Sequence, residues 1–348
     1  MFQRLIKNDL KENKVSMLVI GLFLLLTLTL SFAATRLTVS LTSSIERFVE
    51  TAKSPHLLQM HSGNVNRERL QNFVQQHPEI ASWQLTDFVN VEGSAIRINE
   101  KNSLQDSSQD NGFSSQNQNF DFLLDQNNQP AQPQPGQVYI PLYYYNSGKI
   151  KISDKIRVGK LRLTVQGFIR DAQMNAGLVS SKRFLISQTD LQTLKKEAFA
   201  SNENLIAFRV HKLSQISAVE QAYKNAELES NGPPMITYPT IKMINGFNDA
   251  LVILVMGLLV VAIIGITFLC MRFALLTKIQ EELQQIAVMK IMGLPQSFIS
   301  RVYLTKYYFC LALATIIGWG LSFLLSSPFK KQMVLSMGQS PTPFYSYL

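Results

Sequence analysis

The sequence has very little cysteine. Its 348 residues include two cysteines, Cys270 and Cys310, and both lie inside long apolar runs. The segment before those runs therefore cannot contain an internal disulfide, and its stability must come from its own core. Zinc-type ligand spacing is also missing, because the histidines are scattered along the chain, at His56, His61, His77 and His211.

Catalytic motifs are missing as well. A phosphate-binding loop needs Ser or Thr after its Gly-Lys pair, but Gly148-Lys149 and Gly159-Lys160 are followed by Ile or Leu. The nucleophile elbow G-x-S-x-G and the zinc motif H-E-x-x-H do not occur. Four acids lack calcium-loop spacing and are interpreted as solvated, namely Asp106, Asp110, Asp121 and Asp125. We therefore expect no enzyme activity and no directly bound cofactor or metal.

Three apolar runs have no charged residue in their cores: Val15–Ala34, Ala250–Met271 and Tyr307–Leu325. Each has about 19 or more mostly apolar residues, enough to cross a hydrocarbon layer of about 30 Å as a helix. None shows the polar stripe of a buried soluble helix, so we predict membrane spans at 15–34, 250–271 and 303–325. An ion relay inside the membrane is not expected from such uncharged cores.

The first run also resembles a cleavable secretory leader, because Ser31-Phe32-Ala33 is a small-residue site after an apolar stretch. Its apolar core exceeds the length of about 7–15 residues that is typical of leaders, which favours a retained helix.

The residues before this run, 1–14, predict a cytoplasmic interfacial helix. Their apolar residues recur at helical spacing beside basic residues, at Phe2, Leu5, Ile6 and Leu10.

The net charge of +9 belongs to the membrane flanks rather than to a nucleic-acid surface. Basic residues exceed acidic ones before the first run and between the second and third, so the positive-inside rule places both segments in the cytoplasm. Residues 35–249 are nearly balanced in charge and are predicted to be extracytoplasmic. The chain is thus expected to be a multi-pass protein of a bacterial plasma membrane, with a cytoplasmic amino terminus and an extracytoplasmic tail at 326–348.

Residues 35–249 show both helical and strand periodicity. Helices are predicted at 66–76 and 214–228. A further helix is predicted to begin at Ser187, because Ser187 followed by Asp190 is a helix-start signal. Strands are predicted at 83–91 and 205–210. Short alternating runs from Ile150 to Val165 add further strands, separated by Ser153-Asp154 and Gly159-Lys160. Residues 102–137 are rich in Gln, Asn and Ser, and this composition predicts a mobile low-complexity insertion. The predicted fold class is a membrane protein with helical transmembrane segments and a large extracytoplasmic α+β domain.

Residues 272–302 form a continuous helical pattern that is interrupted at Gly293-Leu294-Pro295. A helix that extends the second span and then turns sharply would be a stiff lever, with a short foot at Gln296–Val302. This segment resembles the signature of FtsX/MacB-type ABC transporter permeases, through residues Glu281, Glu282, Ile286, Met289, Lys290, Gly293, Ile299 and Tyr303.

The resemblance implies a coupling helix over 289–301 that docks on a cytoplasmic ABC ATPase subunit. The residues it assigns to this coupling are Met289, Lys290, Gly293, Leu294, Pro295, Ile299 and Arg301. It further implies that ATP and Mg²⁺ bind in the partner subunit and that a second permease copy or half is present in the bilayer. No nucleic-acid partner is implied.

Two other stretches resemble the same family. "KISDKIRVGKLRLTVQGFIRD" is similar to its paired outer strands, with Ser153 in place of a glycine, and Pro78-Glu79-Ile80 is similar to its Pro-Gly-Val turn. The family has a fourth span, but residues 326–348 offer none. The chain is therefore interpreted as a truncated product, a half transporter or the first part of a two-repeat permease.

The sequence thus favours a permease subunit that couples ATP hydrolysis elsewhere to movement of an outer domain, for export, extraction or sensing of peptide or lipid-like substrates. The alternative is a membrane-anchored receptor or scaffold with an outer binding domain. A receptor needs a cytoplasmic output domain, and the inner segment of about 30 residues is too short to be one.

Overall fold

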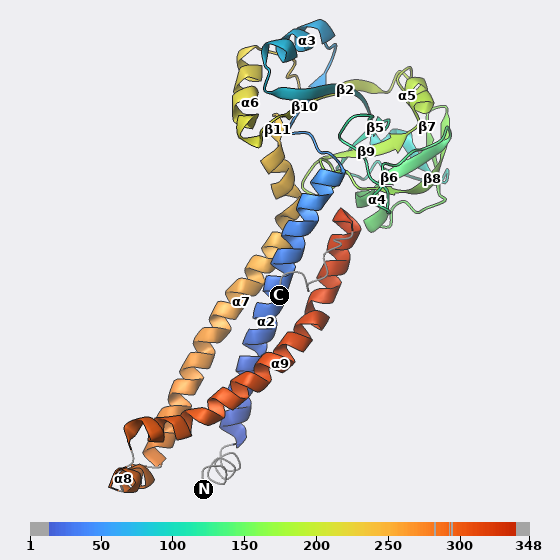
Figure 1. The fold of residues 1–348 in the computed structure, drawn as a ribbon. Coiled ribbons are helices and arrows are strands. Elements are labelled where there is room, and N and C mark those ends of the chain that lie inside the picture. Colours follow the sequence, from blue (N-terminus) through green and yellow to red (C-terminus); the bar gives the residue numbers. More distant parts are fainter. Residues whose placement is uncertain (1–13, 282, 292, 294, 339–348) are drawn as a thin grey trace. The chain divides into compact units, whose positions relative to one another are not determined.

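Four helices carry most of the apolar sequence in a computed structural model of the chain. The structure describes residues 14–281, 283–291, 293 and 295–338. Its long helices are α2 (Lys14–Thr51), α7 (Tyr238–Glu281) and α9 (Gln296–Met337), with the short α8 (Leu283–Ile291) between the last two (Figure 1). Residues 14–41 and 248–332 form one unit, called the helical unit. Residues 42–247 and the segment from Met333 onward form a second unit, called the sheet domain.

The helical unit has the surface of a membrane protein. Leu18–Thr51, Tyr238–Glu281 and Tyr307–Met337 are long and apolar enough to cross a bilayer. Large apolar side chains are exposed around α7, including Leu258 at 63 % and Val261 at 69 %. Water would disfavour so much exposed hydrocarbon, whereas lipid would not. The predicted membrane protein with three candidate spans is confirmed within the described residues.

Helices α2 and α9 approach each other closely. A Cβ atom at Gly318 would lie 3.2 Å from the backbone nitrogen of Thr29, which is tighter than ordinary van der Waals contact, so glycine favours this approach. Further along the same pair, the Arg36 guanidinium lies 3.4 Å from the centre of the Phe323 ring. This cation–π contact lets a buried cation pack against an apolar helix face.

The sheet domain is an α+β domain built on an eleven-stranded sheet with the order β11-β1-β10-β2-β5-β9-β6-β8-β7-β3-β4. The pairs β5 with β9 and β6 with β8 are parallel and the other pairs are antiparallel. The strands are β1 (Leu57–Ser62), β2 (Ile80–Val91), β3 (Ile96–Ile98), β4 (Asn102–Ser103), β5 (Asp110–Ser114), β6 (Gln137–Pro141), β7 (Lys155–Val158), β8 (Leu161–Ile169), β9 (Ser181–Ile186), β10 (Ser201–Val210) and β11 (Ile236–Thr237).

Several apolar cores hold this sheet, and two of them contain its covering helices. Helices α3 (Arg67–Gln76) and α6 (Ile216–Asn225) cover β10 and bury Phe73, Phe208 and Tyr223 together (Figure 1). A larger core lies between β5–β9 and the helices α4 (Leu142–Asn146) and α5 (Gln188–Leu194), with Phe113 stacked on Phe184 at 4.9 Å between ring centres. Short 3₁₀ turns at Gly93–Ala95 and Leu213–Gln215 complete the domain.

Several predicted elements are confirmed. The Asn66 side chain caps α3 by accepting a hydrogen bond from the Arg69 N–H at 3.1 Å. The Ser187 hydroxyl caps α5 by accepting one from the Asp190 N–H, also at 3.1 Å. The strands predicted at 83–91 and 205–210 are the carboxyl-terminal parts of β2 and β10. Ile150 and Ile152 do not begin a strand, because Ser153 takes a positive φ of 75° and Asp154 accepts from the Lys151 N–H, which closes a turn.

The prediction that residues 102–137 form a mobile insertion is wrong. They supply β4, β5 and the first residue of β6, and β5 lies between β2 and β9 inside the sheet. Apolar anchors are fully buried at irregular spacing, namely Leu104, Phe113, Phe120, Leu123 and Leu124. Amide side chains such as that of Gln116 form hydrogen bonds with backbone groups in the turns between these anchors. The average composition of the segment did not indicate this order, because the order depends on a few buried positions.

The membrane helices extend beyond the predicted spans. Helix α9 runs without a break to Met337 although Pro328 removes one backbone donor, so the residues from 326 to 337 are helical rather than a separate tail. Helix α2 likewise continues to Thr51, and α7 begins at Tyr238 and continues to Glu281. The predicted interfacial helix at 1–14 falls almost entirely outside the described residues, as do residues 339–348.

Gln116 tests whether the 102–137 segment is ordered. Its amide nitrogen donates to the carbonyls of Leu123 and Ala131 at 2.8 and 3.1 Å, and its oxygen accepts from two backbone N–H groups. Gln116→Ala leaves these groups unpaired and should cost about 1–3 kcal/mol of stability. We expect a lower thermal unfolding midpoint and faster proteolysis within the segment. The exposed neighbour variant Gln118→Ala should change neither, and equal behaviour of the two would contradict the ordered segment.

Candidate functional site

The turn between α8 and α9 is the break that the sequence predicts. Gly293 adopts a left-handed φ of 80°, and its N–H donates to the Lys290 carbonyl at 3.0 Å. A glycine in this conformation ends a helix at little steric cost, and Pro295 then precedes the first residue of α9. Gly293 and Pro295 therefore set where α8 stops and α9 begins.

The residues assigned to coupling occupy this turn and its flanks. Lys290, Gly293, Pro295 and Arg301 are exposed. Met289 lies in α8 and Ile299 in α9, with side chains outside the description, and Leu294 lies outside the described residues. The foot at Gln296–Val302 is not a separate short helix, since α9 continues from it into the third span. The coupling role of these residues remains a prediction.

Sequence reasoning missed an apolar surface on α8. Leu283, Val288 and Ile291 are exposed by 57, 54 and 86 %, and Lys290 is the only charged residue of this nine-residue helix. An exposed apolar helix of this kind is typical of a surface that contacts a protein partner or a bilayer. The signal was present in the sequence "LQQIAVMKI", which is mostly apolar although it lies outside the three predicted spans.

A second candidate site lies in the sheet domain, where two segments bind the ends of all three long helices. We call residues 121–125 and 170–175 the junction. After α2 ends, the carbonyls of Ala52 and Lys53 accept from the N–H groups of Phe122 and Asp121 at 2.7 and 2.9 Å. Near the start of α7, the Asn245 amide donates to the Ala172 carbonyl at 2.5 Å.

The end of α9 is bound by two junction side chains. Arg170 Nε donates to the Leu335 carbonyl at 2.8 Å, and Asn175 Nδ2 donates to the Ser336 carbonyl at 2.9 Å. The last carbonyls of a helix lack helical partners and carry partial negative charge, so a guanidinium is well suited to them. Arg170 also donates to the Asp125 carbonyl and to Asn128, and the Leu335 side chain packs on the larger core.

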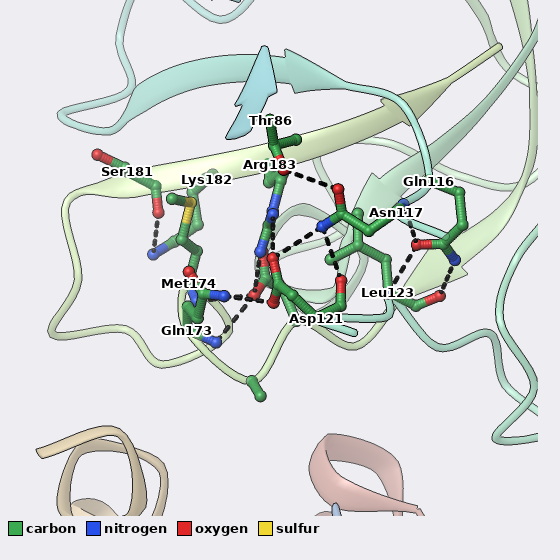
Figure 2. A network of polar contacts seen from close by, with 12 residues as sticks. Thr86, Gln116, Asn117, Asp121, Leu123, Gln173, Met174, Ser181, Lys182 and Arg183 are labelled. Carbon is green, nitrogen blue, oxygen red and sulfur yellow. Dashed lines mark hydrogen bonds and ion pairs between the residues drawn. The ribbon is translucent and has the colours of Figure 1, made fainter. Parts of the chain in front are cut away.

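An ion cluster holds the two junction segments together (Figure 2). Arg183 of β9 donates to Asp171 at 2.6 and 2.9 Å and to Asp121 at 3.0 Å, and its side chain is fully buried. Asp121 also accepts from Asn117 at 3.0 Å and from Gln173, while Asn117 accepts from Thr86 of β2. Each segment of the junction therefore contributes one carboxylate to the same guanidinium.

The cluster has one cation for two anions in a dry setting. Burial raises the pKa of Asp121 to about 6, although Arg183 opposes this change, and nearby Asp171 adds to it. Burial acts against the charge on Arg183, but the two carboxylates outweigh it and raise the pKa of the guanidinium. The interpretation of Asp121 as a solvated acid is therefore wrong, because the residue is 2 % exposed and takes part in this network.

Lys182 secures the loop beside the cluster. Its buried ammonium donates to the carbonyls of Ala176, at 3.0 Å, and Val179. Burial lowers the pKa of Lys182 to about 8. The adjacent Lys182-Arg183 pair inside the otherwise apolar strand "SKRFLI" was the sequence signal for a buried ionic network, since consecutive strand residues face opposite sides and both sides of β9 are covered.

Comparisons with known proteins bear on these sites. Residues 236–348 match the family described as FtsX-like permease C-terminal. The matched part of the chain includes α7, α8 and α9, and the match confirms the resemblance found in the sequence. No match was found among curated proteins.

Solved structures similar to the chain include one extracellular domain and one periplasmic region. The extracellular domain of the ABC-type transporter YknZ from Gram-positive bacteria shares 10 % identity, covers 52 % of this chain and 98 % of its own, and has a TM-score of 0.29. The periplasmic region of MacB from Actinobacillus actinomycetemcomitans shares 10 % identity, covers 56 % of this chain and 94 % of its own, and has a TM-score of 0.30.

Replacing Arg183 tests the ion cluster. Arg183→Met leaves two buried carboxylates without their cation, which should cost about 3–5 kcal/mol near pH 7.5. Because the pKa of Asp121 is raised in the folded protein, this carboxyl stabilises the fold fully below its ordinary pKa and loses that contribution as pH rises through about 6. Without Arg183, ionisation of Asp121 should cost more stability than it does in the wild type. The thermal midpoint of Arg183→Met should therefore lie closer to that of the wild type near pH 5 than near pH 7.5.

Arg162→Met is the matched control, because Arg162 is exposed on β8, which pairs with β6 and β7 rather than with β9. It should leave the thermal midpoint almost unchanged at both pH values. An Arg183→Met variant that loses the same stability at both pH values would show that the two carboxylates do not depend on this guanidinium.

Proposed function

We propose that this chain is the membrane-spanning permease subunit of an FtsX/MacB-type ABC transporter, and that it transmits mechanical changes rather than catalysing a reaction. The observation that carries the proposal is the family match over residues 236–348, which includes α7, the turn at Gly293 and α9. ATP and Mg²⁺ bind in a separate cytoplasmic ABC ATPase subunit in this proposal, and the chain itself binds no cofactor.

The proposed orientation follows the charges. Basic residues around α8 and before α2 face the cytoplasm, and the sheet domain lies outside a bacterial plasma membrane. The exposed face of α8, defined by Leu283, Val288 and Ile291 beside Lys290, is the docking surface for the ATPase. An apolar patch with a nearby cation matches the usual composition of a protein interface, in which an apolar centre is surrounded by polar groups.

Transmission uses the helices and the junction. Each long helix continues from the helical unit into residues of the sheet domain, and there its end is hydrogen-bonded to 121–125 or 170–175. A displacement of α7 or α9 would act directly on segments fixed to one guanidinium. A second permease copy completes the transporter, and peptide or lipid-like molecules are the substrate class for export, extraction or sensing.

Co-purification tests the coupling surface. The detergent-solubilised chain should retain a candidate ABC ATPase subunit from the same genome, whereas Gly293→Trp and Lys290→Glu should lose it. Gly293 takes a positive φ that a side chain disfavours by about 1–2 kcal/mol, so the first variant redirects the turn, and the second reverses the exposed charge. Membrane insertion and thermal midpoint should stay close to wild type.

Lys149→Glu is the control, since it makes the same charge reversal at an exposed site of the sheet domain, and it should keep the ATPase. If no ATPase subunit binds the wild-type chain, the transporter proposal fails and a membrane-anchored receptor or scaffold becomes the better account. Equal loss in the control would instead indicate a general charge effect.

The junction gives a separate prediction. The double variant Arg170→Gln and Asn175→Ala replaces the guanidinium by a shorter amide and removes the Asn175 amide, so both side-chain hydrogen bonds to the end of α9 should be lost. With the ATPase bound, hydrogen–deuterium exchange of residues 121–125 and 170–175 should respond to a non-hydrolysable ATP analogue in the wild type. In the double variant this response should be lost while the ATPase still co-purifies. An unchanged response would show that the α9 end does not transmit the change.

A further inference from the structure

A cleft of about 560 Å³ opens in the sheet domain, within the volume range of small-ligand sites. It lies where the parallel strands β5 and β9 end, since Ser115 follows β5 directly and Ser187 follows β9. The carboxyl ends of adjacent parallel strands are a common position for ligand sites, because the chain leaves the sheet there in diverging loops. The stretch that contains Pro130, Gln132 and Pro133 forms another part of its wall.

The lining of the cleft has a distinctive chemistry. Seven of its eleven lining residues have amide or hydroxyl side chains, and no lining residue is charged, although the chain as a whole carries a net charge of +9. The apolar part consists of Phe122, Ile186 and the two prolines. A charged ligand would lose its hydration here without gaining a counter-charge from any lining residue, so the lining favours a neutral ligand.

The polar groups of the cleft fall into two sets. Gln116 and Asn117 are committed to hydrogen bonds within the wall, and Ser187 caps α5, so these residues fix the shape of the cleft. Gln118, Gln132 and Gln188 are exposed on its surface. Each of these amides offers both donors and an acceptor, and hydroxyl groups, which also donate and accept, are their natural complement.

An extended peptide fits this position less well. Peptides usually bind a sheet by pairing with a free strand edge. Here β5 is paired on both sides, with β2 and β9, and β9 is paired with β5 and β6. A ligand in the cleft must therefore be recognised by side chains, through hydrogen bonds to amides and apolar contact with flat groups such as the Phe122 ring. The Lys53 ammonium lies 5.3 Å from the centre of this ring.

We propose that this cleft binds a neutral carbohydrate, with Gln132 and Gln188 donating to and accepting from its hydroxyl groups and with Phe122 and the prolines contacting its apolar faces. The site does not depend on ATPase coupling, so it stands or falls independently of the transporter proposal. It gives a binding role to the Gln- and Asn-rich segment, which supplies most of the wall.

The test uses the full chain in lipid nanodiscs and two neutral probes, chitotetraose and cellotetraose, with isothermal titration calorimetry as the measurement. We expect at least one tetrasaccharide to bind. The double variant Gln132→Ala and Gln188→Ala should lower its affinity about tenfold or more, because two ligand hydrogen bonds are lost. Gln192→Ala is the matched control, since Gln192 is exposed on the same helix α5 but does not line the cleft.

Three outcomes would overturn the proposal: neither tetrasaccharide binds, the double variant binds as well as the wild type, or the control loses as much affinity as the double variant. N-acetyl-tetra-alanine amide is a neutral peptide probe, and binding of this peptide in preference to both sugars would assign the cleft to a different ligand. Thermal unfolding of each variant separates loss of the site from loss of the fold, and ATPase co-purification reports separately on the transporter proposal.

Discussion

The guanidinium of Arg183 holds together two segments that are distant in the sequence. Asp121 and Asp171 both bind it, and these carboxylates belong to the two segments to which the three long helices are hydrogen-bonded. Removing an ion pair from water costs several kcal/mol per charge, so such a cluster is stable only when nearly all of its polar atoms are paired. Asn117, Gln173 and the backbone N–H groups after Asp171 provide that pairing. The geometry of the cluster thus fixes where the helix ends attach.

The attachment of α9 shows why the junction suits transmission of force. A helix end held only by apolar packing can slide, because such contacts have no preferred direction. The carbonyls of Leu335 and Ser336 instead accept directional hydrogen bonds from Arg170 and Asn175, and the Leu335 side chain packs in the core. A rotation or shift of α9 must break these bonds or move 170–175 with it, and that segment is tied through Asp171 to β9.

Local signals in the sequence were sufficient for the spans, the helix starts at Asn66 and Ser187, and the break at Gly293, because each depends on residues within a few positions of one another. The ion cluster could not be found in this way. Asp121 and Arg183 are separated by 62 residues, and only the fold shows that they meet. Likewise, nothing in the sequence around Arg170 indicates that it donates to the carbonyl of Leu335 at the end of α9, 165 residues further along the chain. Such partners are a matter of topology, which a single sequence specifies only through its whole pattern of burial.

The Gln- and Asn-rich segment shows how composition can mislead. Few apolar residues and many amides usually indicate disorder, because the entropy of ordering the chain is not offset by burial. Here a few anchors such as Phe113 and Phe120 are almost completely buried, and amides such as Gln116 replace water as partners of the backbone in the turns between them. The segment has no Lys or Arg between residues 102 and 137, and a charged side chain at Gln116 or Asn117 would place an unpaired charge within this hydrogen-bonded wall. The same restriction keeps the adjoining cleft uncharged, so the amides that allow the segment to fold also determine which ligands its surface can accept.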